Sequence, residues 1–245
     1  MAIKIGLDAG HGGDSTGTYT IDTAINGLYE KDLTLELCNL VAERLVAHGF
    51  EVFKTRTTDV NCGNVLKRAE MCVAAGCKFA VSVHFNGFGN ESANGTEVFV
   101  PYAEKAAGIE AGFQEYLGKF FKLRAPFARC NSYYDRNKIF DKKLNLSTRK
   151  FEAFSNDKEY FGFIRTAWEN GLSADLLEVC FLTNRKDYDT YIEHKEKIAD
   201  AIARSIVEGY KVEWKPQKPK EELKKEAKKS IGNGRLNKKR VDVKF

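Results

Sequence analysis

The sequence lacks several features that would assign a chain to a class at once. No apolar run approaches the length needed to cross a bilayer, so we expect no membrane span. There is no internal repeat of the solenoid or propeller kind. The segment Met1–Gly6 has neither the long apolar stretch nor the small-residue cleavage site of a secretory signal. We therefore expect the protein to be made in the cytoplasm without a signal peptide.

The six cysteines also lack a diagnostic spacing, because none of them forms a C-x-x-C pair. Most lie in apolar segments, which favours free, buried thiols in a reducing compartment over a disulfide framework. A zinc cluster of Cys62, Cys72 and Cys77 is conceivable, but this spacing fits no familiar structural zinc site.

Positive charge is concentrated at one end of the chain. The net charge is +5 over 245 residues. Residues 214–245 contain twelve Lys or Arg and four Asp or Glu, a local +8, which leaves about −3 for the rest. We therefore divide the chain into a globular domain, residues 1–212, and a basic linker or tail, residues 213–245. A solvated linker is the favoured interpretation, with binding to anionic wall polymers or non-specific binding to nucleic acid as alternatives.

The remaining pattern alternates short apolar strands with amphipathic helices. Strands are predicted to end near Asp8 and to cover residues 50–55, 79–84, 95–100 and 174–181, and helices to cover 30–45, 65–75, 104–123 and 187–210. Residues 124–158 show no clear period and are predicted to be an irregular insertion beside a substrate groove. This order indicates an α/β fold: one domain with a twisted, largely parallel sheet flanked by helices on both faces.

Three potential metal ligands stand where the elements of such a sheet begin or end. His11 follows the first strand, Glu30 opens the first long helix, and His84 ends the third strand. In a parallel sheet these ends face one crevice. Two histidines and a carboxylate are a usual catalytic zinc set with a fourth position open for water. Taken singly, each histidine is better explained as a loop or strand-end residue, and Glu30 as an acid complementing the helix dipole.

Glu178 is a carboxylate inside an otherwise apolar strand, where a charge is costly unless it is paired or used. Beside a zinc-bound water it would serve as general base and then as general acid. Its alternative is a structural ion pair, for instance with Arg165. The glycines around His11 lack the Lys-Ser/Thr of a P-loop and do not match G-x-G-x-x-G, so nucleotide binding is set aside.

Six segments together resemble the zinc-dependent N-acetylmuramoyl-L-alanine amidases of the amidase-3 class, found in bacterial autolysins and phage endolysins. The matching segments are Leu7–Gly13, Tyr29–Leu33, Thr55–Asp59 with Leu66–Ala69, Val81–Asn86, Gly95–Phe99 and Leu177–Asn184. The resemblance covers roughly residues 1–210. It implies zinc held by His11, Glu30 and His84, with Glu178 as the catalytic carboxylate. It also implies that Arg56 and Arg68 link the loops around the site, and it places Asn86 and Arg165 near the groove.

The expected function is hydrolysis of the amide between N-acetylmuramic acid and L-alanine in peptidoglycan, by a phage or bacterial lytic enzyme. Two alternatives remain open: a zinc peptidase that cuts within the stem peptide, and a catalytically inactive peptidoglycan-binding module. We expect the enzyme to reach the wall after holin-type release. The source of the chain, its preferred stem peptide and its oligomeric state are not readable from the sequence.

Overall fold

The computed structural model describes residues 2–131, 139–141, 143–151 and 160–216. The part of the chain from Met1 to Trp214 forms one compact unit. The predicted basic tail falls almost entirely on residues 217–245, which lie outside the described residues. No helix in the described ranges is long and apolar enough to cross a membrane.

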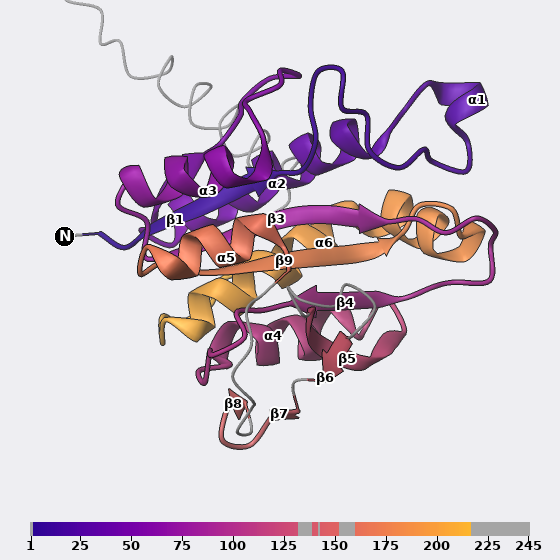
Figure 1. Ribbon diagram of the computed structural model, residues 1–245. Coiled ribbons are helices and arrows are strands. Elements are labelled where there is room, and N and C mark those ends of the chain that lie inside the picture. Colours follow the sequence, from indigo (N-terminus) through magenta and orange to yellow (C-terminus); the bar gives the residue numbers. More distant parts are fainter. Residues whose placement is uncertain (1, 132–138, 142, 152–159, 217–245) are drawn as a thin grey trace, which may run out of the picture. The chain divides into compact units, whose positions relative to one another are not determined.

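A seven-stranded sheet forms the centre of the compact unit, in the order β2-β1-β3-β9-β4-β5-β6 (Figure 1). Its strands are β1 (Lys4–Ala9), β2 (Glu51–Lys54), β3 (Phe79–Asn86), β4 (Thr96–Phe99), β5 (Leu123–Asn131), β6 (Ile139–Asp141) and β9 (Ser173–Phe181). Strands β2, β1, β3 and β9 are parallel, β4 runs antiparallel to β9, and β5 runs parallel to β4. A small separate sheet pairs β7 (Leu144–Asn145) with β8 (Lys150–Phe151).

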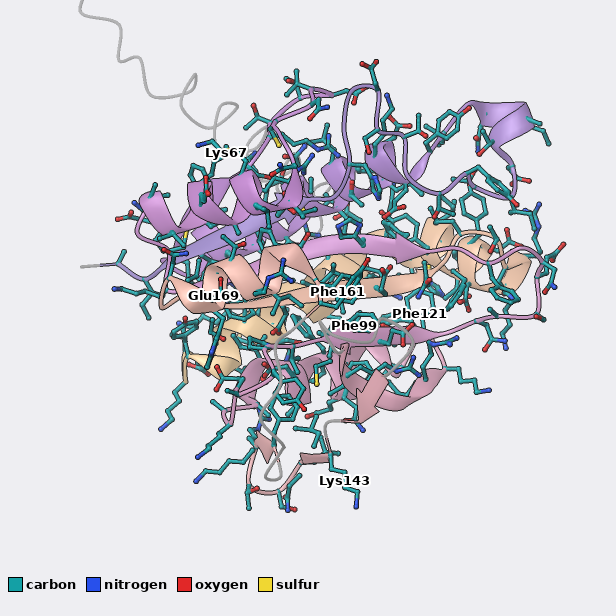
Figure 2. The ribbon with its side chains drawn as sticks, in the orientation of Figure 1. Lys67, Phe99, Phe121, Lys143, Phe161 and Glu169 are labelled. Atoms are coloured by element: carbon teal, nitrogen blue, oxygen red, sulfur yellow. The ribbon has the colours of Figure 1, made fainter. Side chains whose placement is uncertain are left out.

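Helices cover both faces of the large sheet (Figure 1). The helices are α1 (Thr23–Asn26), α2 (Glu30–Ala47), α3 (Val65–Ala74), α4 (Gly108–Leu117), α5 (Gly162–Glu169) and α6 (Arg185–Gly209). Helices α2, α4 and α6 pack over the larger apolar core, and α3 and α5 pack over a smaller one. On the second face, Phe99 of β4 contacts Phe161, which precedes α5, with ring centroids 4.6 Å apart (Figure 2). The α/β prediction is confirmed.

Local sequence explains why the main elements form where they do. The central strand β3 is buried along most of its length, because helices cover both faces of the sheet. Every second side chain from Phe79 to Phe85 faces the larger core, whereas Ser82 and His84 lie on the opposite face. In α2 the side chains of Leu33, Leu37 and Val41 form the buried stripe. The Asp32 carboxylate accepts a hydrogen bond from the backbone N–H of Tyr29 and so caps that helix. These elements, β9 and α6 all lie within a few residues of the predicted positions.

Two predictions in the middle of the chain are wrong. The helix predicted over residues 104–123 is limited to α4, because the chain turns after Leu117 and buries Phe121. The segment predicted to be irregular, residues 124–158, contains most of β5 and all of β6, β7 and β8. Their pattern was weak because β5 contains a proline, Pro126, which is unfavourable inside a strand, and because a register shift separates the pairings of β5 with β4. Residues 132–138, 142 and 152–159 of this segment lie outside the described residues.

Candidate active site

The loop after β1 holds His11 in an unusual conformation. His11 has a φ of 61°, a left-handed value that is uncommon for a residue with a side chain. Its Nδ1 lies 3.0 Å from Ser15 Oγ, which orients the ring so that Nε2 lies 3.2 Å from Glu30 Oε1. The loop therefore directs one imidazole nitrogen toward the first residue of α2.

Glu30 is buried, and both oxygens of its carboxylate are held by neighbouring groups. Its Oε1 accepts a hydrogen bond from the backbone N–H of Phe85 at 3.0 Å and lies 2.9 Å from His84 Nδ1. Its Oε2 accepts from the N–H of Thr18 at 2.8 Å. Burial alone would raise the pKa of Glu30, but the bonds to His11 and His84 hold it well below its usual range. A carboxylate that only complemented the helix dipole would not be enclosed in this way, so the dipole interpretation is insufficient.

His84, near the end of β3, contacts the same Glu30 carboxylate. Burial lowers its pKa, but the hydrogen bond and charge of Glu30 outweigh burial and raise the pKa to about 9. Gly10 makes room for the ring, since a Cβ at this position would lie 2.5 Å from His84 Cε1. The two imidazole rings meet edge to face with centroids 5.0 Å apart.

The three side chains fit a metal ion. One donor atom from each of His11, Glu30 and His84 lies within 4.8 Å of the others, and no other such group of three occurs among the described residues. Two imidazoles and a carboxylate suit zinc and leave a coordination position open. The six cysteines are free. The zinc cluster of Cys62, Cys72 and Cys77 that the sequence made conceivable does not form among the described residues.

Glu178 stands beside His84 on the neighbouring strand. The two residues are paired in register between β3 and β9, so their side chains share one face of the sheet. Burial raises the pKa of Glu178 to about 8. Its Oε2 is buried and has no hydrogen-bond partner among the described residues, which excludes the predicted alternative of an ion pair with Arg165. Arg165 donates instead to the carbonyl oxygen of Tyr160.

Two buried arginines hold the loop that carries His11. Arg56 donates to the carbonyl oxygens of Ala9 and Gly10. Arg68 donates to the carbonyl oxygens of Ala9 and His11 and forms an ion pair with Asp8 at 2.9 Å. These bonds satisfy backbone groups that have no strand partner. They also fix the left-handed turn, so the arginines link the loops around the site as the resemblance implied.

Comparison with known proteins agrees with this geometry. Residues 5–208 match the N-acetylmuramoyl-L-alanine amidase family Amidase_3. The chain is 33% identical to N-acetylmuramoyl-L-alanine amidase AmiA of Salmonella typhimurium, over 82% of this chain and 74% of AmiA.

Two solved structures share the fold. The catalytic domain of the amidase CwlV from Bacillus (Paenibacillus) polymyxa var. colistinus aligns with a TM-score of 0.59 and 24% identity, over 86% of this chain and 99% of that one. Cwp6 from Clostridium difficile aligns with a TM-score of 0.64 and 22% identity, over 86% of this chain. The chain spans only 30% of the length of Cwp6.

The chain belongs to the N-acetylmuramoyl-L-alanine amidase family. Its activity is therefore hydrolysis of the amide that joins the stem peptide to the N-acetylmuramic acid of the glycan strand in peptidoglycan, as the sequence predicted.

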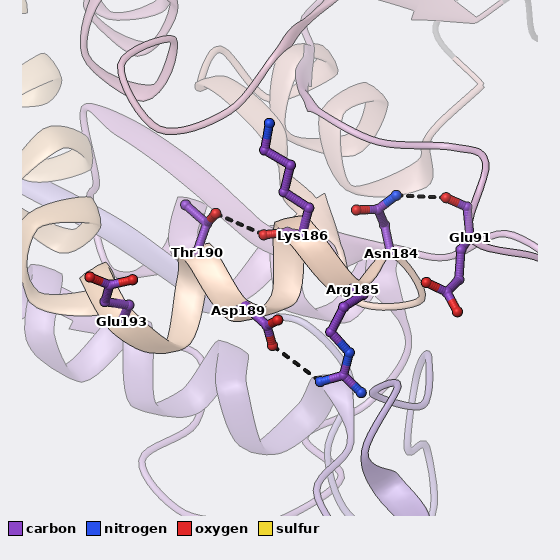
Figure 3. A pocket seen from close by; sticks show the side chains of 7 residues that line it. All are labelled: Glu91, Asn184, Arg185, Lys186, Asp189, Thr190 and Glu193. Atoms are coloured by element: carbon purple, nitrogen blue, oxygen red, sulfur yellow. Dashed lines mark hydrogen bonds and ion pairs between the residues drawn. The ribbon is translucent and has the colours of Figure 1, made fainter.

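A cavity of about 470 Å³ adjoins the two histidines of this amidase and extends to the start of α3. Its lining includes His11, His84, Ser15, Asn61, Asn64 and Arg68. A second cavity, of about 510 Å³, lies at the start of α6 (Figure 3). There Arg185 pairs with Asp189, and Asn184 donates to the carbonyl oxygen of Glu91. Because the cluster of His11, Glu30 and His84 adjoins the first cavity and no such cluster of described residues lies at the second, we assign the chemistry to the first cavity.

Sequence reasoning missed one charged residue next to the site. Glu97 of β4 is paired directly opposite Glu178 of β9, and it is 3% exposed. It forms ion pairs with Arg124, 3.0 Å away, and with Arg129, 2.8 Å away. The signal was available, because Glu97 is a lone acid in the apolar strand Thr96–Phe99, the same pattern that marked Glu178.

Proposed function

We propose that the amidase is zinc-dependent, with His11, Glu30 and His84 as the ligands and Glu178 as the catalytic acid and base. The observation that carries this proposal is the buried, unpartnered oxygen of Glu178 beside the cluster of three potential ligands. Zinc, when bound, polarises a carbonyl and lowers the pKa of water. The donor set is of the kind that holds catalytic zinc.

The chain itself supplies proton transfer and positioning. The raised pKa of Glu178, about 8, suits a group that must both take and return a proton near neutral pH. It removes a proton from the attacking water and then delivers it to the amine of L-alanine, which leaves with the stem peptide. The rigid Arg56 and Arg68 contacts keep the His11 loop in place while these protons move.

The test combines one variant with one chelation experiment on purified peptidoglycan. Glu178→Gln keeps the side-chain shape but cannot exchange the proton, so hydrolysis should fall by at least about a thousandfold while zinc content stays that of the wild type. A chelator should abolish wild-type activity, and added zinc should restore it. Full activity in Glu178→Gln, or activity that a chelator leaves unchanged, would refute the proposal.

Analysis of the products separates the rival reactions. An amidase releases whole stem peptides with a free alanine amine and leaves glycan strands with an unsubstituted lactyl group. A zinc peptidase acting within the stem would instead leave alanine on the glycan. Binding without any release would indicate an inactive module. We propose peptidoglycan as the macromolecular partner, and holin-type release and the role of the basic tail remain predictions.

A further inference from the structure

A row of charged side chains crosses the sheet at the active-site end. His84 of β3, Glu178 of β9 and Glu97 of β4 occupy paired positions on three neighbouring strands. Paired positions project from the same face of a sheet, so the three side chains stand in line. The metal ligands are at one end of this row, and the ion pairs of Glu97 with Arg124 and Arg129 are at the other.

The guanidinium of Arg124 is held in place on two sides. Its Nε lies 3.0 Å from Glu97 Oε1, and its central carbon lies 4.9 Å from the centroid of the Phe181 ring. Glu97 is itself fixed, because Asn86 Nδ2 donates to the same Oε1 at 2.8 Å. A buried carboxylate and an aromatic face therefore orient an arginine whose own side chain is 30% exposed.

The outer edge of that guanidinium has few bonds. Within the described residues, the only hydrogen bond from its terminal nitrogens is a 3.5 Å contact from Nη1 to the carbonyl oxygen of Asn94. A planar guanidinium offers parallel N–H donors that match a carboxylate. Arg129 cannot serve in the same way, because its side chain is only 11% exposed. Arg124 is thus the arginine of the pair that substrate can reach.

The geometry points to Arg124 as the residue that binds a free carboxylate on the stem-peptide residue following L-alanine. This inference rests on the proposed function. Arg124 is ion-paired with Glu97 of β4, which lies two strands from His84 of β3, roughly 10 Å at the usual strand spacing. A carboxylate on the second residue lies on the order of 7 Å beyond the scissile nitrogen, at 3.8 Å per residue. The two separations are therefore of the same order.

The experiment uses two muramoyl peptides that differ at one group. In the first, the residue after L-alanine is glutamate with a free α-carboxylate, and in the second this group is a carboxamide. Arg124→Ala should raise KM for the carboxylate substrate on the order of tenfold to a hundredfold and leave kcat within about twofold, since the contact exists before and during reaction. KM for the carboxamide substrate should change little. Arg124→Lys should recover only part of the loss, because a lysine cannot bind bidentately.

Arg204 of α6 provides a matched control. Its Nε lies 2.8 Å from Glu208 Oε1, and its guanidinium lies over the Tyr116 ring at 4.4 Å, so it reproduces the local setting of Arg124. It is nineteen residues along α6 from Arg185, about 28 Å from the site end of that helix. Arg204→Ala should leave KM for both substrates unchanged.

A binding measurement keeps this inference separate from the proposed function. Titration calorimetry of L-alanyl-γ-glutamate and its carboxamide should show a preference for the carboxylate that Arg124→Ala removes, whatever the reaction catalysed. Equal losses on both substrates, or a carboxylate preference that survives in Arg124→Ala, would overturn the assignment. If the wild-type protein instead bound the carboxylate dipeptide in preference to the carboxamide but released no stem peptides, that result would refute the proposed function and leave the assignment of Arg124 intact.

Discussion

Two buried carboxylates, Asp8 and Glu97, illustrate how the two halves of the sheet differ. Both are nearly inaccessible, at 2% and 3% exposed, and each faces an arginine. Asp8 of β1 also accepts hydrogen bonds from Thr55 and Ser82, and its arginine, Arg68, turns inward to backbone carbonyls. Glu97 of β4 pairs with Arg124, which reaches the solvent.

The difference shows that one type of ion pair performs two tasks. In the parallel half, Asp8 and Arg68 are buried, and their network serves to hold the His11 loop. In the mixed half, the buried carboxylate of Glu97 holds an arginine, Arg124, that remains partly exposed. A buried pair loses much more stability when one partner is removed than an exposed pair does, because the remaining charge stays desolvated. The comparison can therefore be tested through stability as well as catalysis.

The largest effect is expected from Arg68→Ala. This change leaves Asp8 without its cationic partner and frees the carbonyl oxygen of His11, while that of Ala9 keeps its bond from Arg56. Unfolding free energy at pH 7 should fall by about 3–5 kcal/mol, measured by urea denaturation. Zinc content and activity should fall as well. Lys67→Ala is the control, because Lys67 extends from the outer surface of α3 (Figure 2) and is 62% exposed. It should change stability by less than about 0.5 kcal/mol.

An intermediate effect is expected from Glu97→Gln. Arg129 loses its ion pair with Glu97 while buried, but Arg124 can turn toward water, so the cost should be about 1–3 kcal/mol. The same denaturation experiment measures it, and KM for carboxylate-bearing substrates should rise with it. If Glu97→Gln lowered the unfolding free energy as much as Arg68→Ala does, the Glu97 network would not differ in energy from the enclosed network around Asp8.

The smallest effect is expected at the surface pair of Asp22 and Arg185, which joins the loop before α2 to the start of α6. Asp22 accepts two hydrogen bonds from Arg185, and salt can screen the pair because both residues are exposed to solvent. Asp22→Asn should cost less than about 1 kcal/mol, and raising the ionic strength should shrink the difference from wild type. If Asp22→Asn lowered the unfolding free energy by several kcal/mol at every ionic strength, the pair of Asp22 and Arg185 would not behave as a surface ion pair.

Much of the site was predictable because its residues stand at the ends of strongly patterned elements. The glycines around His11, the start of α2 and the end of β3 are all visible in the sequence, and a parallel sheet brings such ends together. Glu178 was conspicuous as a charge in an apolar strand. In the mixed half β4 and β9 were predicted but β5 and β6 were not, because β5 contains Pro126 and its pairing with β4 shifts in register. Short strands at the edge of a sheet carry little pattern of their own.

The sequence by itself determined the α/β class, the order of the main elements and the residues able to bind a metal ion, because these follow from periodicity and residue chemistry. Only the tertiary structure decided that β4 enters antiparallel to β9, which sets Glu97 opposite Glu178. It also decided that Arg68 turns inward to backbone carbonyls while the side chain of Arg124 stays 30% exposed. Strand direction and side-chain exposure depend on contacts between distant segments, and no local pattern encodes them.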